Sequence, residues 1–397
     1  KPLWGLTVLV LGGLSFLNTW DVLIHLFVVL GAFVLNRWRR FGWRSQWLTE
    51  AFWLALLLAI PAILLYLPFY LGFRSQAGAP FLLPTLVRPT RLPQLLIIFG
   101  LPLLGVWALV LSLASRYRFK QWRSGVTTAV SLIVGLFLLA LLLGWVVASS
   151  ADGTGRIVGL ANELGLLLPP RPEGNVAPGW AFTAVATIFP AILQAKLAYP
   201  GVTLMLAMLL GLVVMAWQGL LAKRQKQPNP EESQPGHRSP LPFVLLLTAT
   251  GALLTLGPEF VYLRDNFGVR LNTVFKFYYQ AWVMFGVAGL FSLAYLWLAA
   301  KESGKKIVPA GVTVVYTAVF LGSRCMSVSQ ITPFSFCTHQ SSLSGTMMSL
   351  WEPPFTTNVQ SGPACGTHST ANCSLSIVML NRLLRKRIGS KKTVRVS

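Results

Sequence analysis

Residues 126–148 read VTTAVSLIVGLFLLALLLGWVVA and contain no charged side chain. In an α-helix this stretch would extend about 34 Å, because each residue adds about 1.5 Å. That length crosses the hydrocarbon core of a bilayer, which is about 30 Å thick. A helix is also the expected structure in lipid, because the unpaired edge of a strand finds no hydrogen-bond partner there. The stretch therefore predicts a membrane-spanning helix.

Similar apolar runs recur along most of the 397-residue chain. Of its residues, 54% are hydrophobic and 11% are charged, whereas soluble domains carry about 25% charged residues. This deficit excludes an ordinary soluble domain and predicts an all-α fold, a polytopic transmembrane helical bundle. We expect about nine spans, at 3–17, 22–36, 50–71, 94–114, 126–148, 200–221, 240–257, 281–300 and 307–322.

Basic residues concentrate in alternate loops, at 37–44, 116–123, 223–238 and 301–306. With these spans, all four loops fall on one side of the membrane, and short basic loops are typically cytoplasmic. The sequence therefore predicts a multi-pass protein of the cell membrane whose other loops face away from the cytoplasm. The formal net charge of +22 follows from this topology. No nucleic-acid partner is expected, because no soluble segment groups basic and aromatic residues on a surface.

Two regions depart from this pattern. Residues 176–198 are apolar but include Pro190 and Lys196, and one full crossing there would invert every later loop, so we expect an interfacial or re-entrant helix. Residues 323–397 hold all four cysteines without C-x-x-C spacing, which leaves a disulfide domain or a non-native tail as alternatives. We expect a helical transmembrane domain over 1–322, incomplete at its N-terminus, followed by an irregular, disordered or non-native tail.

The first polar motif, Asn18-Thr19-Trp20-Asp21, interrupts an otherwise apolar stretch. A carboxylate near membrane depth is costly, which makes Asp21 a candidate functional residue. The alternative is a tight turn in which Asn18 and Asp21 cap helix ends. One residue can serve both roles.

The second motif, residues 257–280, joins two predicted spans on the same outer side. Anchoring at the interface accounts for its aromatic residues, but not for its mixed charges. These charges suit an anionic, partly apolar or sugar-bearing ligand. They are Glu259, Arg264, Asp265, Arg270 and Lys276. A third segment, 68–78, contains Arg74 and Gln76 and is either a loop that covers a site or a plain connector.

The run RLNTVFKFYYQAW at 270–282, with NTWD at 18–21 and FRSQAG at 73–78, resembles the Chlor_Arch_YYY family of uncharacterised polytopic membrane proteins. The resemblance covers about residues 3–322. That family is similar in architecture to the GT-C glycosyltransferases, which use lipid-phosphate-linked sugars at the outer membrane face. Members typically have an acidic, His-containing loop before the first motif and further spans after the last matched helices. The resemblance therefore implies that this chain holds only part of a site.

The leading hypothesis is glycosyl transfer from a polyprenyl-phosphate sugar, with membrane lipid as partner. This reaction needs a carboxylate base and cations near the departing phosphate. The catalytic candidates are Asp21, Asp265 and Glu259. The substrate-binding candidates are Asn18, Trp20, Arg74, Gln76, Arg264, Arg270, Asn272, Lys276, Tyr278 and Tyr279. No metal ligands are assigned, although a carboxylate could hold a divalent metal. A transporter or lipid flippase, and a non-catalytic scaffold, are the alternatives.

Overall fold

The computed structural model describes residues 2–74, 82–85, 89–116, 121–170, 178–225, 239–264 and 269–302. All of them belong to the first of two compact units, Lys1–Pro309. The predicted span at 307–322 and the predicted tail at 323–397 lie outside the described residues, as do Gln76 and Asp265.

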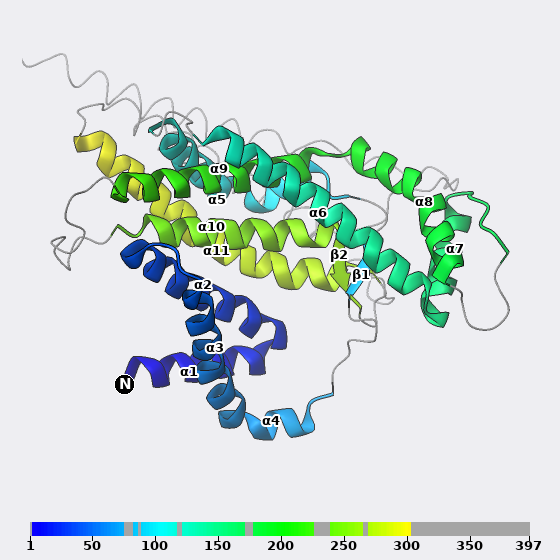
Figure 1. Cartoon of the computed structure of the whole chain (residues 1–397), viewed down its shortest axis with the longest axis horizontal. Helices are drawn as coiled ribbons and strands as arrows, with labels where there is room; N and C mark the ends of the chain where they lie inside the picture. The colour runs from blue at the N-terminus through cyan, green and yellow to red at the C-terminus, as the bar shows by residue number, and fades with distance from the viewer. Residues whose placement is uncertain are drawn as a thin grey trace, which may run out of the picture. The chain divides into compact units, whose positions relative to one another are not determined.

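Helices dominate the described residues (Figure 1). They are α1 (Pro2–Leu17), α2 (Thr19–Phe41), α3 (Gln46–Leu65), α4 (Leu67–Gly72), α5 (Leu92–Arg116), α6 (Trp122–Ala148), α7 (Ala151–Glu163), α8 (Pro178–Ala198), α9 (Gly201–Gln225), α10 (Leu241–Leu256), η1 (Gly257–Glu259) and α11 (Leu271–Glu302). Two short strands, β1 (Leu82–Pro84) and β2 (Val261–Leu263), pair antiparallel. Eight of the described helices are long and apolar enough to cross a membrane. The predicted all-α polytopic bundle is confirmed.

The main bundle consists of α5, α6, α9, α10 and α11. Its core is apolar and includes Phe99, Leu103, Leu109, Leu206, Leu245 and Phe285. Two glycine pairs let helices approach closely. A Cβ added to Gly105 would lie 2.7 Å from the carbonyl oxygen of Gly289, and one added to Gly211 would lie 2.5 Å from that of Gly125. These crossings bring α5 against α11 and α6 against α9.

The helix ends next to the basic loops meet at one end of this unit, which we call the basic end. The indole rings of Trp38 in α2 and Trp217 in α9 lie 5.8 Å apart. The other contacts are Arg39 Nη1 to the Ser239 carbonyl at 3.3 Å, Gln218 Nε2 to Ser124 Oγ at 2.7 Å, and Arg116 Nη1 to Tyr295 Oη at 3.5 Å. The alternation of basic loops read from the sequence thus matches the packing of the described helices.

Helix α8 covers most of the predicted interfacial segment, but its length and composition are those of a helix able to cross a membrane. It packs against α7 and the C-terminal part of α6 (Figure 1). A Cβ added to Gly144 in α6 would lie 3.6 Å from the side chain of Val185. Lys196, near its other end, donates a hydrogen bond to the carbonyl oxygen of Glu259. The first and last residues of α8 therefore both lie on the side of the unit opposite the basic end. Helix α9 starts on the side where α6 finishes.

Helices α1, α2 and α3 form a smaller cluster around Val8, Leu11, Leu58 and Ala62. The predicted span at 50–71 is broken at Tyr66, after which Pro68 occupies the first turn of α4. Proline is tolerated in a first turn, where its missing N–H has no helical partner to lose. Helix α2 joins this cluster to α10, where Gly31 faces the side chain of Leu246.

Candidate functional site

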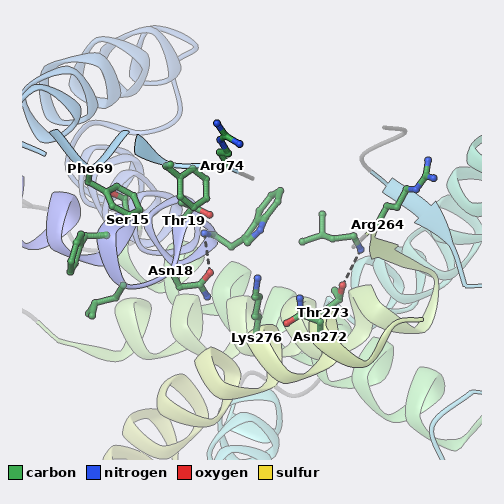
Figure 2. Close-up of a pocket in the computed structure, with 14 residues that line it drawn as sticks. Ser15, Asn18, Thr19, Phe69, Arg74, Arg264, Asn272, Thr273 and Lys276 are labelled. Carbon is green, nitrogen blue, oxygen red and sulfur yellow. Dashed lines mark hydrogen bonds between the residues drawn. The ribbon is translucent and has the colours of Figure 1, made fainter. Parts of the chain in front are cut away.

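A cavity of about 230 Å³ lies at the end of the unit opposite the basic end. One wall comes from the α1–α2 junction and from α4 with the two residues after it, and the other comes from β2, Arg264 and the first turns of α11 (Figure 2). Its lining residues are Ser15, Phe16, Leu17, Asn18, Thr19, Trp20, Phe69, Phe73, Arg74, Leu263, Arg264, Asn272, Thr273 and Lys276. All three motifs singled out in the sequence contribute to this lining.

The first motif forms the break between α1 and α2. Asn18 is the N-cap of α2, with extended backbone (φ −155°, ψ 114°), and its side chain accepts a hydrogen bond from the Trp20 amide at 3.5 Å. Its amide nitrogen Nδ2 also donates to Asp21 Oδ1 at 2.8 Å. Capping thus holds the Asn18 side chain between the cavity and the Asp21 carboxylate.

Asp21 is buried, with 8% of its surface exposed, although it lies only in the first turn of α2. Its carboxylate also forms a hydrogen bond with the side chain of Gln280 and interacts electrostatically with Lys276 and His25. The His25 ring nitrogen Nδ1 lies 2.9 Å from the Asp21 carbonyl oxygen. The motif at 18–21 and the aromatic run at 270–282 therefore meet, although about 250 residues separate them in the sequence.

Positive side chains lie at both walls of the cavity. Figure 2 shows Lys276 rising from α11 toward the space between the walls, with Arg74 and Arg264 at opposite rims. Thr273 is buried and accepts a hydrogen bond from the Leu263 amide at 2.9 Å, which fixes β2 to α11. Among the described residues that line the cavity, there are cations and neutral polar groups but no carboxylate. The lining therefore suits an anion.

Glu259, a predicted catalytic residue, lies outside the cavity lining and is fully buried. Arg270 Nη1 donates to its Oε1 at 2.7 Å. Thr90 donates twice, from Oγ1 to Oε1 at 2.5 Å and from its backbone amide to Oε2 at 2.9 Å. Lys196 donates to the Glu259 carbonyl and lies 5.1 Å from the centre of the Phe260 ring. This network joins α8, the segment before α5, and the start of α11.

The predicted tyrosines also lie away from the lining. Tyr278 is buried against Phe99, with ring centres 5.2 Å apart, while Tyr279 is 61% exposed on the outside of α11. Sequence reasoning did not place Thr90, Ser15 or Lys196 in any site. A charge within an apolar helix was a signal for Lys196, whereas an isolated threonine or serine gives none.

In the part of the chain that the structure describes, no group of three or more His, Cys, Asp or Glu side chains is placed to hold a metal ion. The candidate divalent metal therefore has no set of ligands among these residues.

A family profile described as an uncharacterized membrane protein (DUF2298) matches residues 1–285. The chain belongs to the DUF2298 family. The matched residues include all three motifs and every residue that lines the cavity. No curated protein and no solved structure matches the chain. Membership in the DUF2298 family establishes that the chain is a membrane protein.

Proposed function

We propose that the protein transfers a sugar from a polyprenyl-phosphate carrier to an acceptor hydroxyl at the extracytoplasmic face of the cell membrane. The observation that carries the proposal is the position of Lys276, which lines the cavity together with Arg74 and Arg264 and interacts with the buried carboxylate of Asp21. The orientation rests on the positive-inside rule, because the cavity and the basic end lie at opposite ends of the bundle.

The cavity suits the headgroup of such a carrier. Lys276, Arg74 and Arg264 offer positive charge for a phosphate, and arginine suits a phosphate particularly well because its planar fork of donors matches the oxygens. Phe16, Phe69, Phe73 and Trp20 add aromatic surface for a sugar ring or the first apolar groups of the carrier. Ligand pockets usually measure about 300–1,000 Å³. The smaller volume here fits a headgroup whose lipid chain stays in the bilayer.

In the proposed reaction, the acceptor hydroxyl oxygen attacks the anomeric carbon and forms a new glycosidic bond. The bond from that carbon to the phosphate oxygen breaks, and its electron pair leaves with the polyprenyl phosphate. The hydroxyl proton passes to the carboxylate of Asp21, which lies next to the lining residue Asn18 and acts as general base. Lys276 stabilises the negative charge that develops on the phosphate.

Two of the predicted catalytic carboxylates have no such role in this proposal. Asp265 lies outside the described residues. Both carboxylate oxygens of Glu259 are held by Arg270 and Thr90, and we assign it to positioning the start of α11. The transporter alternative gains no support from the middle of the described bundle, where buried residues such as Phe99, Leu103 and Phe285 are apolar. The narrower resemblance to Chlor_Arch_YYY and GT-C proteins is consistent with the proposal.

The test is a transfer assay with the full-length protein in proteoliposomes and a radiolabelled polyprenyl-phosphate sugar. Asp21→Asn should lower the rate about 100-fold to 10,000-fold, the usual contribution of a general base. Arg123→Gln removes a charge at the basic end, far from the cavity, and should leave the rate unchanged. An Asp21→Asn rate equal to that of the wild type would remove Asp21 from the mechanism. No transfer by the wild type with any lipid-phosphate sugar would overturn the proposed function.

A further inference from the structure

The turn between α2 and α3 is a compact cluster of arginine and tryptophan residues at the basic end. It extends from Arg37 to Trp47 and includes Arg39, Arg40, Arg44, Trp38 and Trp43. Both flanking helices are long and apolar enough to span a membrane. The turn that joins them therefore lies at a membrane surface, at the level of the lipid headgroups.

Local contacts hold this turn together. Gly42 ends α2 with a left-handed backbone (φ 76°), and its amide donates to the Trp38 carbonyl at 2.9 Å. Its own carbonyl accepts a hydrogen bond from the buried Trp47 indole at 3.0 Å. The Trp38 ring packs on Trp43 at 5.1 Å between ring centres. The turn thus presents its remaining side chains from a fixed frame.

The arginines of this turn fall into two classes. Arg37 pairs with Glu50 at 3.2 Å and lies over the Trp47 ring, and Arg39 donates to the Ser239 carbonyl. Arg40 and Arg44 are exposed, and within the described ranges the guanidinium group of neither has a hydrogen bond or an ion pair. The exposed rings of Phe41 and Trp43 lie next to them in the sequence. Two uncommitted guanidinium groups beside apolar rings match a phosphate attached to acyl chains.

We propose that this turn binds the headgroup of an anionic phospholipid, with Arg40 and Arg44 on the phosphate and the Phe41 and Trp43 rings at the acyl boundary. Charge complementarity favours an anionic lipid over a zwitterionic one, because basic side chains near a membrane surface are attracted to anionic lipids. The described residues on either side of the α5–α6 loop, Arg116 and Arg123, have contacts of their own. Arg116 is bonded to Tyr295 and Arg123 lies over the ring of Trp122.

The experiment measures the preference of the full-length protein, in bilayers, for spin-labelled phosphatidylglycerol over spin-labelled phosphatidylcholine. Replacing both Arg40 and Arg44 with Gln should lower this preference by more than about 25-fold, because general attraction contributes about fivefold per charge and the charge-assisted hydrogen bonds to the phosphate are lost as well. The control pair Arg116→Gln and Arg123→Gln removes the same charge at the same end and should lower it less. An equal loss of lipid preference in both pairs would show that the basic end attracts anionic lipid only through its general charge. That result would overturn the proposed lipid site.

A second pair keeps the test valid if the loss of charge disturbs insertion. Arg40→Lys with Arg44→Lys retains the positive charge and therefore the topology. It removes the planar guanidinium groups, which can each donate two parallel hydrogen bonds to one phosphate. We expect a loss of preference between those of the two glutamine pairs. Lipid preference equal to that of the wild type in this lysine pair would contradict binding of phosphate by the guanidinium groups. None of these outcomes depends on the proposed transferase activity.

Discussion

Two buried carboxylates lie at the same end of the bundle, and they are held in opposite ways. Glu259 has no exposed surface, and both of its oxygens accept hydrogen bonds from Arg270 or Thr90. Asp21 is held by the neutral side chains of Asn18 and Gln280, and it interacts with a lysine that lines a cavity. Glu259 is therefore assigned to structure, whereas Asp21, which bonds to the lining residue Asn18, is the carboxylate to which we propose a role in chemistry.

The largest expected effect comes from breaking the sealed pair. Glu259→Gln should lower the free energy of unfolding by about 3 kcal/mol, because Arg270, whose side chain is 21% exposed, loses its ion pair with a fully buried carboxylate. Reversible unfolding in bicelles measures this. The control is Glu50→Gln, whose pair with Arg37 is 38% exposed on each side, and which should change stability by about 0–1 kcal/mol.

The double variant Glu259→Gln with Arg270→Gln sharpens the assignment of Glu259 to positioning. The double variant also removes the Arg270 charge, which has lost its ion pair in Glu259→Gln. The double variant should therefore be more stable than Glu259→Gln. Its transfer rate should recover in parallel. If stability recovers while transfer stays as low as in the single variant, Glu259 takes part in the chemistry and its assignment is wrong.

A smaller loss of stability is expected from a substitution at a helix crossing that is remote from both Asp21 and Glu259, and this substitution serves as a control. Gly211→Ala would place a Cβ 2.5 Å from the Gly125 carbonyl oxygen, and such overpacking costs about 1–3 kcal/mol. Because this crossing lies toward the basic end, affinity for polyprenyl phosphate should be unchanged in the folded fraction. A parallel loss of affinity would show that general destabilisation, and not the cavity wall, controls binding.

The smallest expected effect on stability tests the Asp21 side. Asn18→Ala removes the N-cap of α2 and should cost about 0.5–2 kcal/mol. It also removes the donor to Asp21 Oδ1, so the transfer rate should fall by more than this loss of stability explains. Thr7→Ala, which removes a hydrogen bond on the exposed face of α1, should change neither quantity. An Asn18→Ala rate equal to that of Thr7→Ala would separate Asn18 from the function.

Much of the fold was predictable because lipid imposes simple constraints on sequence. Charge-free runs such as 126–148 predicted the helices. The basic residues in the loops predicted that α2, α5 and α9 end on the same side of the bundle. The break at Tyr66 was missed because residues 50–71 form one apolar run, in which Pro68 alone did not mark a new helix. Helix α8 lies within the segment expected to be an interfacial or re-entrant helix, and Pro190 is accommodated inside it.

The site was predictable in part. A carboxylate and an asparagine between two apolar runs identified 18–21, and the charges around Lys276 identified the start of α11. The sequence did not distinguish Glu259 from Asp21, because their difference lies in partners that are distant along the chain. Thr90 is 169 positions from Glu259 and Gln280 lies far from Asp21. Only the packing of the helices reveals which acid is sealed.

The most direct test of the proposed cavity is equilibrium binding of radiolabelled polyprenyl phosphate to the full-length protein in bilayers. Lys276→Gln should weaken binding at least tenfold, because a charge-assisted hydrogen bond to phosphate contributes about 1.5–3 kcal/mol. Arg123→Gln should bind as the wild type does, since its charge lies at the basic end. Equal affinity in the wild type and both variants would contradict the assignment of this cavity to a lipid phosphate.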